Sequence, residues 1–205
     1  EILFKKTIEN HQKVKHIYIL NSICPALQTS TATSHQELQS AKKCVLKFVT
    51  VIIEKTFPQE LFGSKRNKAR LFSKIALLLN LKLNERVPSH LLTEGIKLKE
   101  ISWLGKPTER IDKLEREKRQ EIFEAFVHWL FEKFVPKLLY TFFYCTEVSS
   151  AIEILFFRQD VWKNMTSGFL NSYIDKHLVE NSQCEIHDSY SYSNFNHGFL
   201  RLVPK

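Results

Sequence analysis

The chain has 205 residues, 43% of them hydrophobic, so it can bury a sizeable core and global disorder is excluded. Only 5 glycines and 6 prolines are present, too few for the many tight turns of an all-β sandwich or barrel. With 30 basic against 22 acidic side chains, the formal net charge is +8. This surplus favours an anionic partner, nucleic acid before an anionic membrane surface, and solubility alone stays open as the alternative.

Motifs that would indicate catalysis or metal binding are sparse. The four cysteines are scattered and none lies in a C-x-x-C pair, so no zinc site is predicted and free thiols in a reducing compartment are expected. No glycine-rich phosphate loop, two-metal carboxylate pair, secretory signal or membrane-spanning run is visible. We therefore expect a non-catalytic domain of a longer protein, without its own metal or cofactor and without a membrane partner.

Periodic apolar residues predict three helices in the first half of the chain. The first runs from His16 and closes before Pro25, the second covers about residues 36–55, and the third covers about residues 65–79. Ser64 is the expected N-cap of the third helix. The predicted buried stripe of the second helix is Leu38, Ala41, Val45, Phe48, Val49 and Ile52.

The third helix begins with an unusual run of positive charge. Lys65, Arg66, Lys68 and Arg70 stand in its first turns with no acid among them. Because the helix dipole favours acids at this end, the arrangement costs about 0.3 kcal/mol per charge. Lys65 and Arg66 are therefore candidates for contact with an anionic partner, and a solvated basic face is the alternative.

The second half is predicted to contain a buried central helix. A short helix is expected over residues 87–98 and a long one from about Thr108, whose first turns mix acids and bases as a solvated face does. From Ile122 onward this helix is apolar nearly all round, which predicts central burial. Pro136 should kink or restart it.

Two apolar-aromatic runs near residue 150 predict a hairpin. Residues 142–147 and 151–158 are rich enough in β-branched and aromatic side chains to form its strands, and a further helix is expected after the second strand. The predicted fold is therefore mainly α, a single all-helical-type domain with one β-hairpin. The domain is expected to occupy residues 1–180, followed by a linker in residues 181–205.

Four segments, in order, resemble the motifs of the telomerase reverse transcriptase family. "WLFEKFVPKLLYTFFYCTEVSSAIEILFFRQDVW" resembles the telomerase-specific T motif, and "FPQELFGSKRNKARLFSKIALLLNL" with the later "ISWL" resembles the QFP region. "ILNSICPAL" resembles the CP motif, and "LRLVPK" resembles the opening motif of the reverse transcriptase fingers. We assign CP to residues 16–27, QFP to 57–104, T to 129–163, and the start of the fingers to the 181–205 segment. This order identifies the chain as similar to a telomerase RNA-binding domain.

The resemblance implies a mostly helical domain that grips the telomerase RNA through two adjacent surfaces, one built by the T motif and one by the CP motif. The T-motif positions carried onto this chain are Tyr144, Thr146, Arg158 and Trp162. Lys163 is expected to substitute for a basic residue that is common in the family where this chain has Gln159. The CP positions are Cys24 and Pro25, with Lys15, His16 and Tyr18 as further candidates.

The chemistry of these residue types suits RNA. Arginine forks and lysines bind phosphate, and aromatic rings stack on unpaired bases. Strand alternation places Tyr144 and Thr146 on one face, which we expect to line an RNA groove, and Phe143 and Cys145 on the other. The alternative is that Tyr144 and Trp162 are core aromatics whose polar atoms are satisfied.

The resemblance also implies what lies outside the chain. The family's catalytic aspartates and Mg²⁺ belong to a polymerase domain beyond Lys205, so RNA-directed DNA polymerase activity is expected of the parent protein and not of this fragment. Nuclear localisation at telomeres, telomeric DNA reached through the full-length protein, and accessory telomerase subunits as candidate partners are implied too. A helical protein-interaction scaffold of a nuclear ribonucleoprotein, with a basic surface that serves solubility, remains the alternative.

Overall fold

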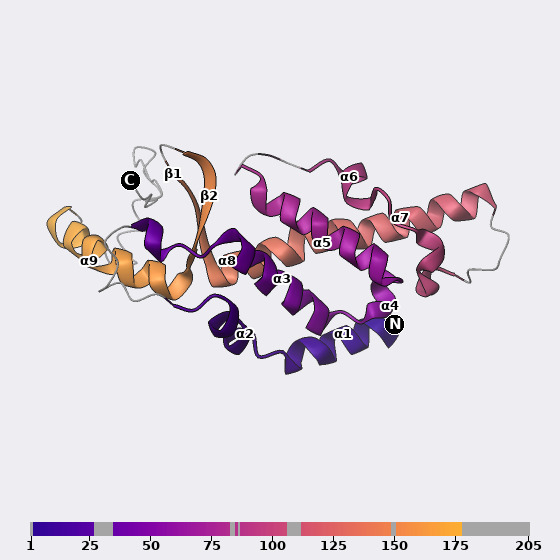
Figure 1. Ribbon diagram of the computed structural model, residues 1–205, viewed down its shortest axis with the longest axis horizontal. Coiled ribbons are helices and arrows are strands. Elements are labelled where there is room, and N and C mark those ends of the chain that lie inside the picture. Colours follow the sequence, from indigo (N-terminus) through magenta and orange to yellow (C-terminus); the bar gives the residue numbers. More distant parts are fainter. Residues whose placement is uncertain are drawn as a thin grey trace, which may run out of the picture.

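The computed structural model describes residues 2–26, 35–82, 85, 87–105, 112–148 and 151–177 (Figure 1). The helix start expected at Thr108 and the linker and finger motif expected in residues 181–205 lie outside these residues. Within them the chain is mainly helical and carries one two-stranded antiparallel hairpin, which confirms the predicted fold class. No helix in these ranges is long and apolar enough to cross a bilayer.

Three helices form the N-terminal part of the domain. They are α1 (Ile2–Lys13), α2 (His16–Ile23) and α3 (Lys42–Thr56), and a 3-10 turn, η1 (His35–Leu38), precedes α3. The end of α2 before Pro25 is as predicted. The predicted start of α3 is wrong, because the helix begins only at Lys42. The N–H of Ser40 donates instead to the carbonyl of Phe156 at 2.7 Å. Ala41, expected in the buried stripe, is exposed.

The QFP-like segment folds into short helices around one long one. They are α4 (Gln59–Phe62), α5 (Lys65–Asn80) and α6 (Ser89–Thr93), with the 3-10 turns η2 (Leu98–Glu100) and η3 (Ser102–Leu104). Ser64 caps α5 as predicted, since its Oγ accepts the N–H of Asn67 at 3.2 Å. The helix expected over residues 87–98 is only five residues long, because the chain turns at Gly95, whose φ is 77°, and the buried Asn67 side chain binds the backbone of Lys97.

A helical rod runs along the domain towards the hairpin (Figure 1). It consists of α7 (Lys113–Trp129), a π-helical turn η4 (Leu130–Phe134) and α8 (Val135–Phe142). Pro136 has no N–H and its ring crowds the preceding turn, so the wider π turn lets the rod continue, in agreement with the predicted kink or restart. All-round burial is wrong at Ile122 and Trp129, which are 55% and 45% exposed.

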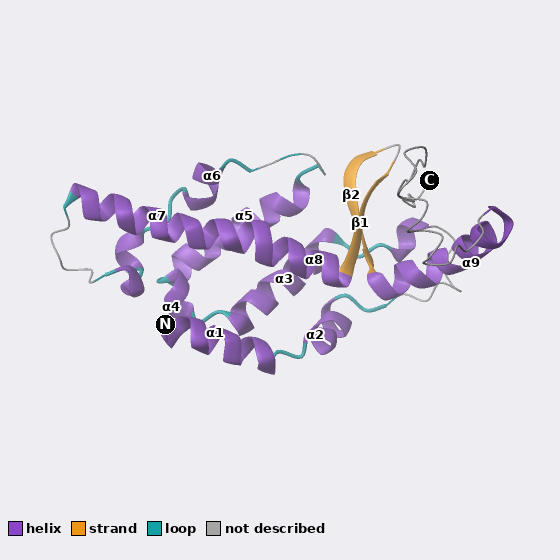
Figure 2. Ribbon diagram, turned by 180° about the vertical axis from the view of Figure 1, so that it is seen from behind, coloured by secondary structure: helices purple, strands orange, loops and turns teal. Residues whose placement is uncertain are grey.

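The hairpin follows the rod directly. Its strands are β1 (Phe143–Val148) and β2 (Ala151–Arg158), and α9 (Gln159–His177) continues from β2 without a loop. Phe143 lies opposite Arg158 and Thr146 lies opposite Leu155 in the antiparallel register. Figure 2 shows the hairpin standing between the helical body and α9.

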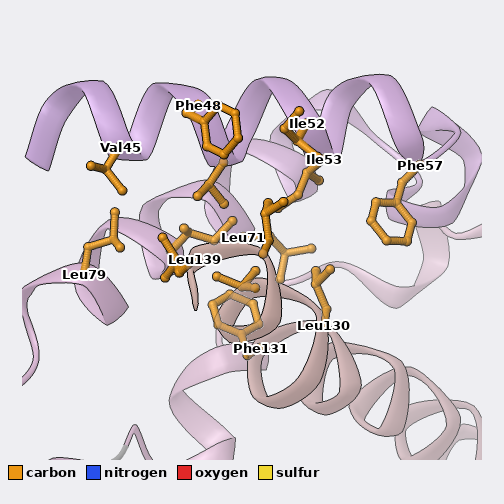
Figure 3. Close-up of a cluster of buried hydrophobic side chains, with 14 of the residues drawn as sticks. Val45, Phe48, Ile52, Ile53, Phe57, Leu71, Leu79, Leu130, Phe131 and Leu139 are labelled. Carbon is orange, nitrogen blue, oxygen red and sulfur yellow. The ribbon is translucent and has the colours of Figure 1, made fainter. Parts of the chain in front are cut away.

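Two hydrophobic clusters bury the two faces of the hairpin. The main core gathers side chains from α3, α5 and the rod, among them Val45, Phe48, Ile52, Leu71, Leu130 and Leu139 (Figure 3). Phe143 and Phe156 extend this core onto one face of the hairpin. On the other face Phe157 packs with Leu38 and Trp162 in a second cluster. The hairpin is therefore packed on both sides, by the helical body and by α9 with η1.

Candidate nucleic-acid interface

Arg158, at the end of β2, is turned into the protein. Only 5% of the residue is exposed. Its Nη1 donates to the backbone carbonyl of Cys24 at 2.7 Å, and its Nε and Nη2 donate to the two carboxylate oxygens of Asp160 at 3.0 and 2.5 Å. This arrangement contradicts the expectation of an arginine fork open to phosphate, because the side chain is buried and three of its N–H groups already bind protein groups. The side chain instead joins the T motif to the CP motif.

Asp160 is the negative partner that keeps this junction neutral. Its Oδ1 also accepts the N–H of Val161 at 2.8 Å, in the first turn of α9. The hydrogen bond from Arg158 is the main reason that the pKa of Asp160 lies below its usual range. The carboxylate is therefore charged at neutral pH and holds the arginine in its inward orientation.

Helix α2 is held against the base of the hairpin at both of its ends. At the start of α2, the His16 ring stacks on Phe142, with 5.9 Å between ring centroids and 13° between planes. At its end, the carbonyl of Cys24 accepts from Arg158, which pairs across the hairpin with Phe143. Two motifs far apart in the sequence thus become neighbours, as the resemblance implied.

The other T-motif side chains are mostly interior. Tyr144 and Trp162 stack with 4.1 Å between ring centroids and 9° between planes, and Trp162 is only 8% exposed. This fits the alternative in which Trp162 is a packed aromatic, while Tyr144 remains half-buried. Thr146 is completely buried and its Oγ1 donates to the Glu147 carbonyl at 3.3 Å. The expectation that Thr146 faces an open groove is therefore wrong, because the second cluster covers that face of the hairpin.

A group of exposed lysines lies on the CP side, in a cleft between α1, α2 and α3 that we call the lysine cleft. Its volume is about 410 Å³. It is lined by Asn10, Lys13, Val14, Lys15, Tyr18, Ile19 and Lys55. Tyr18 is 73% exposed at its edge, and Ile19 closes its apolar side.

The lysine cleft has the charge and shape of an anion site. Lys13, Lys15 and Lys55 are all exposed, no acid lines the cleft, and none of the three forms an ion pair within the described part of the chain. Three unneutralised ammonium groups around one hollow raise the local potential and attract phosphate. An exposed tyrosine beside them adds a stacking surface.

Sequence reasoning found Lys15 and Tyr18 but missed the rest of this cleft. Lys13 ends α1 and was assigned to no motif, and Lys55 comes from the last turn of α3. Only the packing of α1 and α2 on α3 brings these residues together. The one available signal was the excess of basic residues before Tyr18, which the CP resemblance did not cover.

The remaining candidates fall in several places. Pro25 and Lys163 are exposed beside the junction of the two motifs. Gln159, where the family commonly has a base, donates from Nε2 to the carbonyl of Tyr140 at 3.0 Å and so satisfies the end of α8. Lys65 and Arg66 are exposed at the start of α5 beside α4, at the end of the domain away from the hairpin (Figure 1), so the structure does not bring them to the junction.

Ionisation within the CP region is also set by packing. Burial lowers the pKa of His16 below its usual value, and His11 lowers it further. The centroids of the two imidazole rings are 5.0 Å apart. Burial raises the pKa of the Cys24 thiol to about 11. Cys24 is 3% exposed, so its contribution at the surface is its backbone and not its sulfur. RNA contact at Cys24 stays a prediction, and its buried sulfur offers no surface for that contact.

Comparison with known proteins decides the family. Residues 44–173, more than half of the chain, match the family described as the RNA-binding domain of the telomerase ribonucleoprotein complex. The chain belongs to this family. It is 41% identical over its whole length to a Saccharomyces cerevisiae telomerase reverse transcriptase, of which it covers 23%.

Two solved structures bear out the telomerase RNA-binding domain fold. A vertebrate RNA-binding domain of telomerase is 27% identical, with a TM-score of 0.74 over 84% of this chain and 71% of that one. A crystal structure described as the TRBD domain of TERT and the CR4/5 of TR is 26% identical, with a TM-score of 0.66 over 88% and 76%. This chain spans about a fifth of the length of the curated telomerase reverse transcriptases that it matches.

Proposed function

We propose that this telomerase RNA-binding domain binds the telomerase RNA mainly through the lysine cleft and the adjoining junction of α2 with the hairpin. The observation that carries the proposal is the grouping of Lys13, Lys15 and Lys55 without an acid beside an exposed Tyr18. The relative described with the CR4/5 of TR supports RNA as the anion. Proteins meet structured RNA largely through phosphates, unpaired bases and the 2′-hydroxyl, which this cleft suits.

Each part of the junction then has a separate role. The three lysines neutralise phosphates, and Tyr18 stacks on an unpaired base, a contact that contributes about 1–3 kcal/mol. Pro25 and Lys163 are exposed beside this junction and are secondary contacts, whereas Tyr144 lies on the other face of the hairpin, stacked on Trp162. Arg158 positions α2 against the hairpin and does not itself touch RNA.

The role of the whole protein follows from its family and is also a proposal. A longer parent protein would be an RNA-directed DNA polymerase that uses Mg²⁺ in its polymerase domain, acts on telomeric DNA in the nucleus, and recruits accessory telomerase subunits. Among the described residues no group of three or more His, Cys, Asp or Glu side chains could hold a metal ion. In this proposal the domain anchors the RNA template and leaves the chemistry to the rest of the protein.

A salt titration of RNA binding tests the proposal. The cognate telomerase RNA is titrated with the chain between about 50 and 300 mM salt, and a length-matched unrelated RNA serves as the control. Because each neutralised phosphate releases counterions, the logarithm of the affinity should fall linearly with a slope of about −0.7 to −0.9 per contact. We expect a slope of at least 2 in magnitude and a preference for the cognate RNA. A slope near zero would instead support the protein-interaction scaffold.

A further inference from the structure

A second hollow lies along the rod, on the edge of the domain opposite α1 and α2. Two adjoining cavities of about 440 and 690 Å³ share Leu92, His128 and Glu132, so they form one continuous groove beside α6, α7 and η4. We call it the acidic groove. Figures 1 and 2 both place α6 and α7 along the edge away from α1 and α2, so the acidic groove and the lysine cleft do not overlap.

The acidic groove has an apolar floor. Leu92 of α6, Val127 of α7 and Phe131 of η4 line it and are at most 5% exposed. Trp129 stands at its side with 45% of its surface exposed, fixed from behind by the rings of Phe57, Phe126 and Phe134. A partly exposed tryptophan that packs on other rings beside an apolar floor is typical of protein interfaces.

The rim of the groove carries the opposite charge to the chain as a whole. Among the described residues, Glu85, Glu124 and Glu132 line it, against one lysine, Lys133, and His128. His128 is itself next to an acid, with 3.0 Å between its Nε2 and Glu132 Oε1. On a chain of formal net charge +8, a rim with more carboxylates than ammonium groups disfavours RNA and favours a cationic occupant.

We propose that the acidic groove is a docking site for a cationic amphipathic helix of a partner protein. The elongated apolar floor fits leucine-type side chains at helical spacing, and the glutamates fit lysines or arginines along the flanks of such a helix. Two adjoining cavities, each lined by glutamates, suit an elongated helix better than a compact ligand. This proposal does not depend on the proposed RNA site.

A designed peptide provides a defined probe. We use a fluorescein-labelled 18-residue amphipathic helix of leucines and lysines, with a second peptide in which glutamates replace the lysines, and measure anisotropy with the whole chain at 0.15 M salt. We expect the lysine peptide to bind at least tenfold more tightly than the glutamate peptide. Glu124→Lys combined with Glu132→Lys should weaken the lysine peptide at least tenfold.

A matched control separates the groove from general electrostatics. Glu117→Lys combined with Glu121→Lys makes the same change in net charge on exposed positions of α7 outside the groove, and should change binding by less than twofold. Trp129→Phe should weaken the lysine peptide severalfold, and circular dichroism confirms that each variant keeps its helix content. Equal binding of the two peptides, or an equal loss in the control pair, would overturn the proposal.

Two competing occupants are separated in the same series. Sedimentation shows whether the chain dimerises. If it does, and the double variant Glu124→Lys with Glu132→Lys is monomeric, the groove binds a second copy of this chain and the proposal fails. If the telomerase RNA displaces the peptide and binds less tightly to Trp129→Phe, the groove belongs to the RNA surface and the proposal fails. If the chain is a monomer and the lysine peptide stays bound at saturating RNA, these results support a separate protein-binding site.

Discussion

The lysine cleft and the acidic groove are hollows on opposite edges of one small domain, and they differ mainly in the sign of their charge. Among the described residues, Lys13, Lys15 and Lys55 line the first with no acid, whereas three glutamates and one lysine line the second. The floors differ too, since Tyr18 offers an open ring in the cleft and Trp129 stands over a packed apolar floor in the groove. The net charge of +8 is therefore unevenly distributed, and it predicts two kinds of partner instead of one.

The largest effect should come from removing the charge of the lysine cleft. Replacing Lys13, Lys15 and Lys55 together by alanine should weaken RNA binding about 50-fold at 0.15 M salt and reduce the salt slope by about 2, because three phosphate contacts are lost. Filter binding or anisotropy at several salt concentrations measures both. The matched control replaces three exposed lysines elsewhere, Lys99, Lys113 and Lys118, and should cost less than fivefold. An equal loss of RNA affinity in the two triple variants would show that the cleft lysines contribute no more than other surface lysines.

Arg158→Ala should give the next largest effect, with a different signature. We expect the free energy of unfolding to fall by about 2 kcal/mol, since a charged hydrogen bond to a buried carbonyl is lost. RNA affinity should fall roughly tenfold as α2 loosens, while the salt slope stays unchanged because no phosphate contact is removed. A slope reduced by about 1 would show instead that Arg158 turns outward and grips the RNA.

Acidification should destabilise the domain through His16. Its folded-state pKa is lowered, mainly by burial and then by His11, so the unfolded chain takes up the proton more readily. The contribution of His16 is present above the unfolded value of about 6.5 and is lost as pH falls through it towards the folded pKa. Denaturant melts between about pH 7 and 5.5 should therefore show a fall in unfolding free energy that His16→Gln reduces. The exposed His90→Gln serves as the control, and an unaltered slope in His16→Gln contradicts the assignment.

The smallest effect on RNA should come from the acidic groove. Glu124→Lys with Glu132→Lys adds positive charge on the edge away from the lysine cleft, so RNA affinity should change by less than threefold at 0.15 M salt, where charges farther apart than about 8 Å are screened. The same anisotropy assay measures it. A tenfold gain with an altered salt slope would mean that RNA wraps around both edges, and the two hollows would be parts of one surface.

Much of the architecture was predictable because it is local. Ser64 as a cap, the restart of the helix at Pro136 after the π turn, and the two strands of the hairpin each depend on neighbours in the sequence, and all three were placed correctly. The family and its RNA-binding role were also predictable, from four motifs in order. The predicted start of α3 was wrong because the N–H of Ser40 donates to the carbonyl of Phe156, a partner more than a hundred residues away.

The site was less predictable than the fold for the same reason. Alternation in a strand cannot reveal that both faces are covered, so Thr146 was expected to be accessible, whereas it is buried on the face that the second cluster covers. Charge alone cannot tell an inward arginine from an outward one, because the carboxylate of Asp160 and the carbonyl of Cys24 decide the orientation of Arg158. Lys55 enters the site only through helix packing.

The hydrogen bond from Arg158 to the carbonyl of Cys24 joins residues 134 positions apart, which has a consequence for folding during synthesis on the ribosome. At synthesis rates of about 5–20 residues per second, the arginine emerges roughly 7–27 s after its partner. During that interval α2 lacks the contact that fixes its C-terminal end, and the closure of so long a loop comes late in folding. The junction of α2 with the hairpin is therefore expected to form late in folding, after the residues of the lysine cleft have been synthesised.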